Sequence, residues 1–220
     1  QLTDRIGESR RWVAEMSRLM RDMDTSMGMV FSLEWKPRTA ENGEELDVAE
    51  LEQILLRDRE LLTVEDVEKV AAHFRSKIRT EKQALEESGG IINYMDLVRD
   101  AMDYRKWFAF QMYYRRGEGP RKLLTNAAFN RFSGGEKAMA MYVPLFAAVN
   151  AQYQKAGRED HPRMMALDEA FAGVDDQNIR SMFELVQKLD FDYIMNSQAL
   201  WGCYRTVPAL RIAELIRPKN

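Results

Sequence analysis

The chain has 220 residues, of which 45% are hydrophobic and 30% charged, with a formal net charge of -3. This balance is typical of a helix-rich globular protein of one domain, or one domain with an appendage, and excludes a largely disordered chain. No apolar run approaches the roughly 20 residues of a membrane-spanning helix, and no secretory segment starts the chain, so a cytoplasmic location is expected. The small negative charge leaves any DNA contact to a local patch.

Two further features concern the cellular compartment and the extent of the chain. The single cysteine, Cys203, excludes an internal disulfide and fits a reducing compartment, and we interpret it as a small buried side chain. Because the chain begins at Gln1, we expect it to be a fragment of something longer.

Residues 2–29 are expected to form an amphipathic helix. Apolar residues at spacings of three and four lie on one face, namely Trp12, Met16, Leu19, Met23 and Met27. The stripe resembles the seam of a coiled coil. It is too short to distinguish a coiled-coil arm from a helix packed on its own domain.

Residues 30–36 alternate apolar and polar and predict a strand, whereas residues 47–87 predict helices. Thr63 and Asp66 have the spacing to cap the second helix. The apolar positions of that helix are Val64, Val67, Val70, Ala71 and Phe74. His73 lies in the same helix with no second ligand at a useful spacing, so we interpret it as a surface or core side chain rather than a metal ligand.

Residues 93–102 predict a further helix, and residues 107–114 with 121–124 predict a β-hairpin. The hairpin is basic and has two interpretations. It is either a DNA contact or a solvated turn beside Glu118, and we favour the turn. The basic residues are Arg115, Arg116, Arg121 and Lys122.

The run FSGGEKA at residues 132–138 is the first candidate site. Ser133 and Glu136 have the S-x-x-E spacing of a capping box that starts a helix. That cap does not explain Gly134 and Gly135, because glycine destabilises a helical turn unless the backbone approaches another group closely. Exposed N–H groups at a helix N-terminus also bind anions, so the same cap would aim these amides at a phosphate.

A second candidate site is the acid pair Asp168 and Glu169, which follows the apolar run at residues 164–167. The pattern fits a buried parallel strand with carboxylates at its C-terminal edge, where ligands of α/β proteins bind. Asp168 could then hold magnesium through water, and Glu169 could polarise an attacking water. The alternative is an acid pair that starts a helix. The sequence AGVD at residues 172–175 comes next, before a predicted helix over 178–189 and another buried strand over 191–197.

Together these residues resemble the C-terminal half of an ABC-type ATPase head, over about residues 121–220. FSGGEKA is similar to the signature motif, ALDEAF to the Walker B motif with its catalytic glutamate, and AGVD to the D-loop. The resemblance implies an α/β lobe that uses ATP and magnesium, with Asp168 at the metal and Glu169 as a catalytic residue. Gln198 stands in place of the usual switch histidine, which implies a catalytic position with a weaker or water-mediated contact to the γ-phosphate. The implied nucleotide-binding residues are Ser133, Gly134, Gly135, Glu136 and Asp175.

A phosphate-binding loop of the form GxxxxGK[ST] does not occur before Ser133. In ABC transporters this loop and the signature share one compact domain. Its absence suggests half-heads separated by a long coiled-coil insertion, as in SMC, SbcC and MukB-like proteins. Residues 1–29 would then end the coiled-coil arm. Residues 30–220 would form the C-terminal lobe, with a helical part near 44–102 and a signature and Walker B part near 103–220. The last residues further resemble ATPases of bacterial plasmid-defence (Wadjet, JetC-type) systems.

This resemblance implies a composite ATP site, completed by an N-terminal lobe that carries the Walker A loop, and a fragment that is inactive alone. Other implied partners are a second head, a kleisin-type subunit and nucleoid DNA, which ATP hydrolysis would loop or clamp. One alternative is an SbcC-like DNA-repair ATPase that works with a nuclease. Another is a scaffold that dimerises on ATP without turnover, which Gln198 favours.

Overall fold

The structure is a computed structural model that describes residues 2–23, 28–91, 93–158, 160–197 and 203–216. The chain divides into two compact units, which we describe separately. The helical unit comprises residues 1–11 and 34–111, and the motif-bearing unit comprises residues 12–33 and 112–220. No helix in the described parts is long and apolar enough to cross a membrane.

The helical unit is built around a small aromatic and aliphatic core. The first turns of α1 (Leu2–Asp22) belong to it, and its other helices are α2 (Val48–Leu55), a 3-10 turn (Arg59–Leu61), α3 (Val64–Glu87), α4 (Tyr94–Ala101) and a second 3-10 turn (Tyr104–Trp107). The capping box predicted for α3 is confirmed, since Thr63 Oγ accepts the Asp66 N–H and the Asp66 carboxylate accepts the Thr63 N–H. The core residues are Ile6, Val48, Leu51, Trp107 and Phe108.

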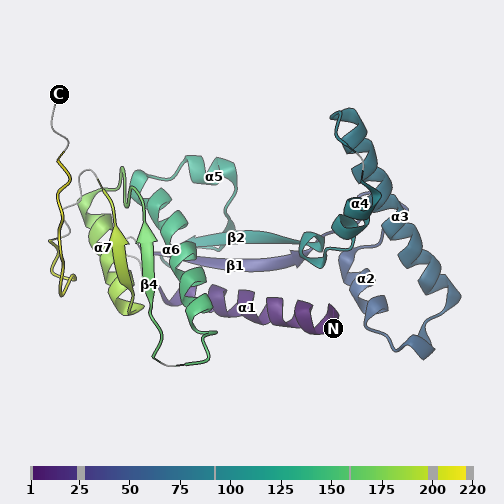
Figure 1. Ribbon diagram of the computed structural model, residues 1–220, viewed down its shortest axis with the longest axis horizontal. Helices are drawn as coiled ribbons and strands as arrows, with labels where there is room; N and C mark the ends of the chain where they lie inside the picture. Colours follow the sequence, from purple (N-terminus) through teal and green to yellow (C-terminus); the bar gives the residue numbers. More distant parts are fainter. Residues whose placement is uncertain (1, 24–27, 92, 159, 198–202, 217–220) are drawn as a thin grey trace. The chain divides into compact units, whose positions relative to one another are not determined.

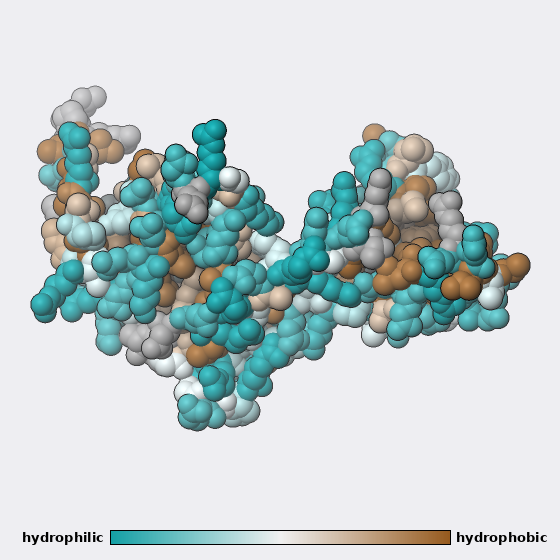
Figure 2. All heavy atoms as spheres, turned by 90° about the horizontal axis from the view of Figure 1, so that it is seen from below, coloured by the Kyte–Doolittle hydropathy of each residue, from teal (hydrophilic) through white to brown (hydrophobic). Residues whose placement is uncertain are grey.

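Two side chains of α3 lie differently from the predicted apolar stripe. Val70 and Phe74 pack against the core of the helical unit, but Val64 is 77% exposed and Val67 56% exposed. Figure 2 shows hydrophobic residues reaching the surface of this unit. His73 lies in the core, where its Nδ1 accepts the N–H of Leu46 at 3.1 Å, and burial lowers its pKa.

The motif-bearing unit packs its helices beside a parallel strand pair. Its further elements are α5 (Asn126–Asn130), α6 (Gly134–Tyr153), β4 (Met164–Leu167), α7 (Asp176–Lys188) and β5 (Asp192–Met195). Figure 1 shows α6 and α7 beside the β4–β5 pair. Met139, Val143 and Phe146 of α6 are completely buried at the centre of the core. The α/β class predicted from the sequence is confirmed.

The apolar stripe of α1 enters this same core. Met16 and Met23 are buried in it, and Trp12 and Leu19 pack against it, while Met27 lies outside the described residues. The helix ends at Asp22, earlier than predicted, and strand β1 begins at Met29. Packing on its own domain therefore accounts for the stripe over this length. The coiled-coil arm stays a prediction.

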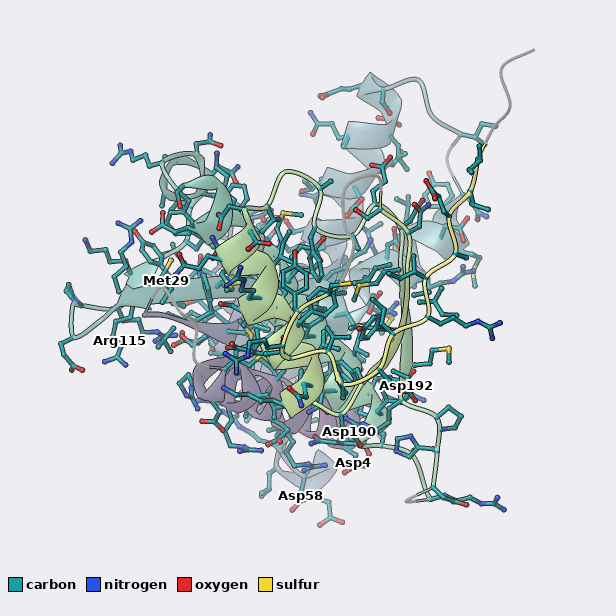
Figure 3. The ribbon with its side chains drawn as sticks, turned by 90° about the vertical axis from the view of Figure 1, so that its left-hand side faces the viewer. Asp4, Met29, Asp58, Arg115, Asp190 and Asp192 are labelled. Carbon is teal, nitrogen blue, oxygen red and sulfur yellow. The ribbon has the colours of Figure 1, made fainter. Side chains whose placement is uncertain are left out.

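Two sheets are present in the described residues. One has the order β1-β2-β3, formed by β1 (Met29–Pro37), β2 (Phe108–Arg116) and β3 (Lys122–Leu123). The antiparallel pairing of β2 with β3 confirms the predicted hairpin. Figure 3 shows Met29 and Arg115 at one end of this sheet, where the Gly117 N–H donates to the Gly28 carbonyl. In the second sheet β4 and β5 run parallel, with Met164 opposite Asp192 and Leu167 opposite Met195.

Three predictions about burial were wrong. Strand β5 was expected to be buried, but none of its residues from Asp192 to Met195 is buried. Strand β4 was expected to be buried throughout, but only Met165 is buried, and Met164 remains 49% exposed. The reason is that α6 and α7 contribute to a core on one side of the strand pair, while its other side is open, as the 61% exposure of Ile194 shows. Cys203, expected to be buried, is exposed because it lies in a C-terminal segment without helix or strand.

Candidate nucleotide-binding site

The signature-like run forms the capped start of α6. Ser133 is the N-cap: its Oγ accepts the Glu136 N–H at 3.2 Å, and the Glu136 carboxylate accepts the Ser133 N–H at 2.8 Å. The predicted capping box is thus confirmed. The Ser133 hydroxyl keeps its own proton as a donor. The Glu136 N–H is bound by the cap and Gly135 is buried, so the exposed donors at the start of α6 are the Ser133 hydroxyl and the N–H of Gly134, where an anion could bind.

Glu136 also joins this helix start to the hairpin. Its Oε1 lies 2.8 Å from Arg116 Nη2, and the Arg116 guanidinium lies 5.3 Å from the ring centre of the buried Phe132. Arg121 contacts the ring of Tyr113 at 3.7 Å. Arg115 lies 3.9 Å from Glu118, so three of the four basic hairpin residues are engaged within their own chain. This engagement favours the structural interpretation of the hairpin over the DNA contact.

Gly135 approaches another part of the chain closely, as the cost of a glycine in a helical turn predicted. A Cβ on Gly135 would lie 2.6 Å from Cγ of Asn178, closer than real Cβ atoms come to their neighbours. Asn178 lies in the first turn of α7, directly after the D-loop-like residues. A Cβ on Gly134 would be 3.8 Å from the Gly173 carbonyl, an ordinary contact. The signature-like and D-loop-like segments therefore lie side by side.

Asp175 is the N-cap of α7. Its Oδ1 accepts the Asn178 N–H at 3.1 Å, and its Oδ2 accepts from Asn178 Nδ2 at 2.6 Å. These hydrogen bonds, the side-chain one foremost, lower the pKa of the Asp175 carboxyl. Asp175 therefore has a structural task in addition to the nucleotide contact predicted for it.

Asp168 follows β4 directly, at the C-terminal edge of the parallel pair, as predicted. Its Oδ1 accepts from Asn196 Nδ2 at 2.7 Å and from the Glu169 N–H at 3.1 Å. Asn196 follows the neighbouring strand β5, and its N–H donates to the Leu167 carbonyl at 3.0 Å. Asn196 therefore fixes the orientation of Asp168 while the carboxylate stays exposed.

Glu169 begins a strained turn. Its φ of 50° is left-handed, as is the φ of 57° at Phe171, and this conformation costs a non-glycine residue about 1–2 kcal/mol. The turn is held from two sides. The Ala170 N–H donates to the Asn196 carbonyl at 2.9 Å, and the Phe171 N–H donates to the Tyr142 hydroxyl at 3.0 Å. The Glu169 side chain is exposed.

These groups could supply part of a magnesium site but not all of its ligands. Magnesium is usually held by one or two carboxylates together with phosphate oxygens and water, and Asp168 supplies one exposed, oriented carboxylate. Among the described residues, no group of three or more His, Cys, Asp or Glu side chains could form an all-protein metal site. A metal here would need oxygen ligands from a phosphate.

Sequence reasoning missed three residues that organise this site, Asn178, Asn196 and Tyr142. The position of Asn196 carried a usable signal, because it directly follows the strand after Asp168 and parallel strands end at one edge. No comparable signal marked the contact of Asn178 with Gly135 or that of Tyr142 with the Phe171 N–H, because both depend on the packing of α6. Gln198, predicted as catalytic, lies outside the described residues.

Comparison with known proteins bears on this arrangement. The family described as "SbcC/RAD50-like, Walker B motif" matches residues 99–188, which is less than half of the chain. No curated protein matches. Ten chains of solved structures match.

One of these solved structures is the Smc head domain with an extended coiled coil, bound to the C-terminal domain of ScpA, from Pyrococcus furiosus. It is 12% identical with a TM-score of 0.35, over 85% of this chain and 28% of that chain. The present chain thus spans little more than a quarter of that chain's length. Residues 99–188 hold every candidate site residue except Gln198, and they are similar to the Walker B segment of SbcC/RAD50-like ATPases.

Proposed function

We propose that this chain is the C-terminal half of an SMC-like ATPase head, which completes an ATP site with a lobe that carries the Walker A loop. The order of the signature-like run, the acid pair and the D-loop-like run within residues 99–188 supports the family assignment. The packing of the first against the third supports a common site.

The observation that carries this proposal is the incomplete parallel sheet. Parallel strands occur almost only where both faces of the sheet are covered. Here β4 and β5 form a two-stranded parallel sheet that leaves Met164 49% exposed and Ile194 61% exposed. Asp168 lies at the C-terminal end of this pair. A second α/β lobe that covers this surface would bring its phosphate loop toward that edge.

In this assembly each residue has a distinct task. The Ser133 hydroxyl and the N–H groups of Gly134 and Gly135 would donate to the γ-phosphate of a nucleotide held by the opposing head, with Glu136 keeping the cap in place. Asp168 would bind magnesium through water on its own head, and the metal would neutralise phosphate charge. Glu169 would accept a proton from the attacking water. Gln198 would lie near the γ-phosphate.

The test is reconstitution. The chain is mixed with a Walker A lobe, and ATP hydrolysis is measured for each part alone and for the mixture. We expect turnover only in the mixture, and loss of turnover with trapped, ATP-bound dimers for Glu169→Gln. Ser133→Arg should block head engagement and spare nucleotide binding. Full turnover of the mixture that contains Glu169→Gln would refute the assignment.

The wider role follows from this proposal. Hydrolysis would drive DNA looping or clamping through coiled-coil arms with a kleisin-type subunit, in a nucleoid or plasmid-defence setting. The second candidate is an SbcC-like DNA-repair ATPase that works with a nuclease, which the SbcC/RAD50-like description favours. ATP-dependent DNA cleavage by the purified complex would select the repair role, whereas translocation without cleavage would select the first. ATP-dependent dimers without turnover would select a scaffold.

A further inference from the structure

Asn178 is bound to the D-loop-like segment on one side. It lies in the first turn of α7 and is only 6% exposed. Its backbone N–H and its side-chain Nδ2 donate to the two different oxygens of Asp175, at 3.1 and 2.6 Å. One residue thus occupies both oxygens of the carboxylate and fixes its orientation.

The same side chain contacts the signature-like segment on its other side. A Cβ on Gly135 would lie 2.6 Å from Asn178 Cγ and 3.0 Å from Asn178 Oδ1, so Gly135 must stay a glycine while Asn178 keeps its position. Gly135 does not need glycine for its backbone conformation, because it lies within α6 and has no positive φ. The requirement is therefore steric, and Asn178 imposes it.

Stability alone does not favour an asparagine at this position. Its Oδ1 is buried without a hydrogen-bond partner among the residues that the structure describes. An unsatisfied buried acceptor is costly. The polar side chain nevertheless gives the carboxylate of Asp175 a donor that an aliphatic side chain would lack.

We propose that Asn178 is a positioning residue that joins Asp175 to Gly135, so that the D-loop and the signature loop keep one fixed relation. This inference rests on the proposed function, because both loops are assigned there to nucleotide. Without Asn178 the Asp175 carboxylate would turn independently of the Ser133 cap. Nucleotide-dependent association of two heads requires both loops at once, so loss of Asn178 would weaken that association.

The steric part is tested by a double-mutant cycle on thermal unfolding of the full chain. Gly135→Ala should lower Tm in the native background, because the methyl group meets Asn178. In an Asn178→Ala background the same change should leave Tm unchanged or raise it, because alanine suits a helix better than glycine. Asn150→Ala is the matched control. It removes another buried asparagine, which accepts from Arg163 at 2.5 Å, and should not relieve the Gly135→Ala defect. Equal losses of Tm in both backgrounds would overturn the proposed steric contact between Gly135 and Asn178.

The positioning part is tested on ATP-dependent association of assembled heads, in a Glu169→Gln background that prevents turnover. Asn178→Ala should raise the Kd for association about tenfold, the loss expected for a hydrogen bond to a charged group. Asn178→Asp keeps the shape but sets a carboxylate against Asp175, so its defect should shrink as the pH is lowered. Unchanged association in both variants would overturn the positioning role. If the heads of the Glu169→Gln protein do not associate with ATP, the proposed function fails. The double-mutant cycle on Tm still tests the contact between Gly135 and Asn178 in that case.

Discussion

Removal of the Arg116 side chain should destabilise the start of α6. Arg116 Nη2 lies 2.8 Å from Glu136 Oε1, and the guanidinium also lies 5.3 Å from the ring centre of Phe132. The Glu136 side chain is 14% exposed, so its carboxylate is shielded from water and depends on the few partners it has. Those partners are Arg116 and the N–H of Ser133.

The expected cost follows from these contacts. An exposed ion pair contributes about 0.2–1 kcal/mol to stability. The Arg116 side chain is 55% exposed, but Glu136 is shielded from water, so we expect this pair to contribute near the upper end of that range. A cation over an aromatic ring adds about 0.5–1 kcal/mol at an exposed site. We therefore expect Arg116→Ala to cost about 1–2 kcal/mol in the free energy of unfolding.

Urea unfolding followed by circular dichroism would measure this loss, with Glu136→Gln to separate the charge from the packing. Glutamine keeps an acceptor for the Ser133 N–H, so in its presence Arg116→Ala should cost about 0.5–1 kcal/mol less. Arg115→Ala is the matched control. Arg115 is 3.9 Å from the fully exposed Glu118, and its loss should stay within about 0.5 kcal/mol. The reasoning is refuted if Arg116→Ala costs the same with and without the Glu136 charge.

Three further predictions concern the caps and one buried histidine. The pKa of Asp175 is lowered by its hydrogen bonds from Asn178, so its stabilising effect is present above the unfolded value of about 4 and is lost as pH falls through the lower folded pKa. Asp175→Asn should reduce this loss of stability at acidic pH, as measured by denaturant unfolding at a series of pH values. An unchanged pH dependence would contradict the role of Asp175 as a cap. Burial lowers the pKa of His73, so as the pH falls its imidazole is protonated in the unfolded chain before it is protonated in the folded chain. The helical unit should therefore lose stability as the pH falls below about 6.5. His73→Asn should reduce that loss in melts followed between about pH 8 and 5, whereas an identical pH dependence would show that His73 is not its source. Ser133→Ala should cost about 1 kcal/mol of stability, and Ser133→Thr, which keeps the Oγ acceptor, should cost less; equal costs in chemical denaturation would speak against the cap.

Local patterns predicted much of the secondary structure because their causes are local. The S-x-x-E spacing at Ser133 and the Thr63–Asp66 spacing each specify a helix start through side chains three residues apart, and both caps formed. The apolar run before Asp168 predicted strand β4 and the placement of the acid at its end. Burial was predicted less well. Periodicity identifies a helical face or a strand, but it does not say whether another element covers it, as Val64 and Met164 illustrate.

The sequence by itself determined the order of the candidate motifs and the residue types that suit phosphate and magnesium, since both depend on composition and spacing along the chain. Only the tertiary structure decided which residues hold those motifs in place. Asn178 meets Gly135 because the starts of α6 and α7 lie side by side, and Asn196 meets Asp168 because β4 and β5 are parallel neighbours. These contacts join residues 43 and 28 positions apart, so no local pattern encodes them, and they arise only when packing brings the elements together.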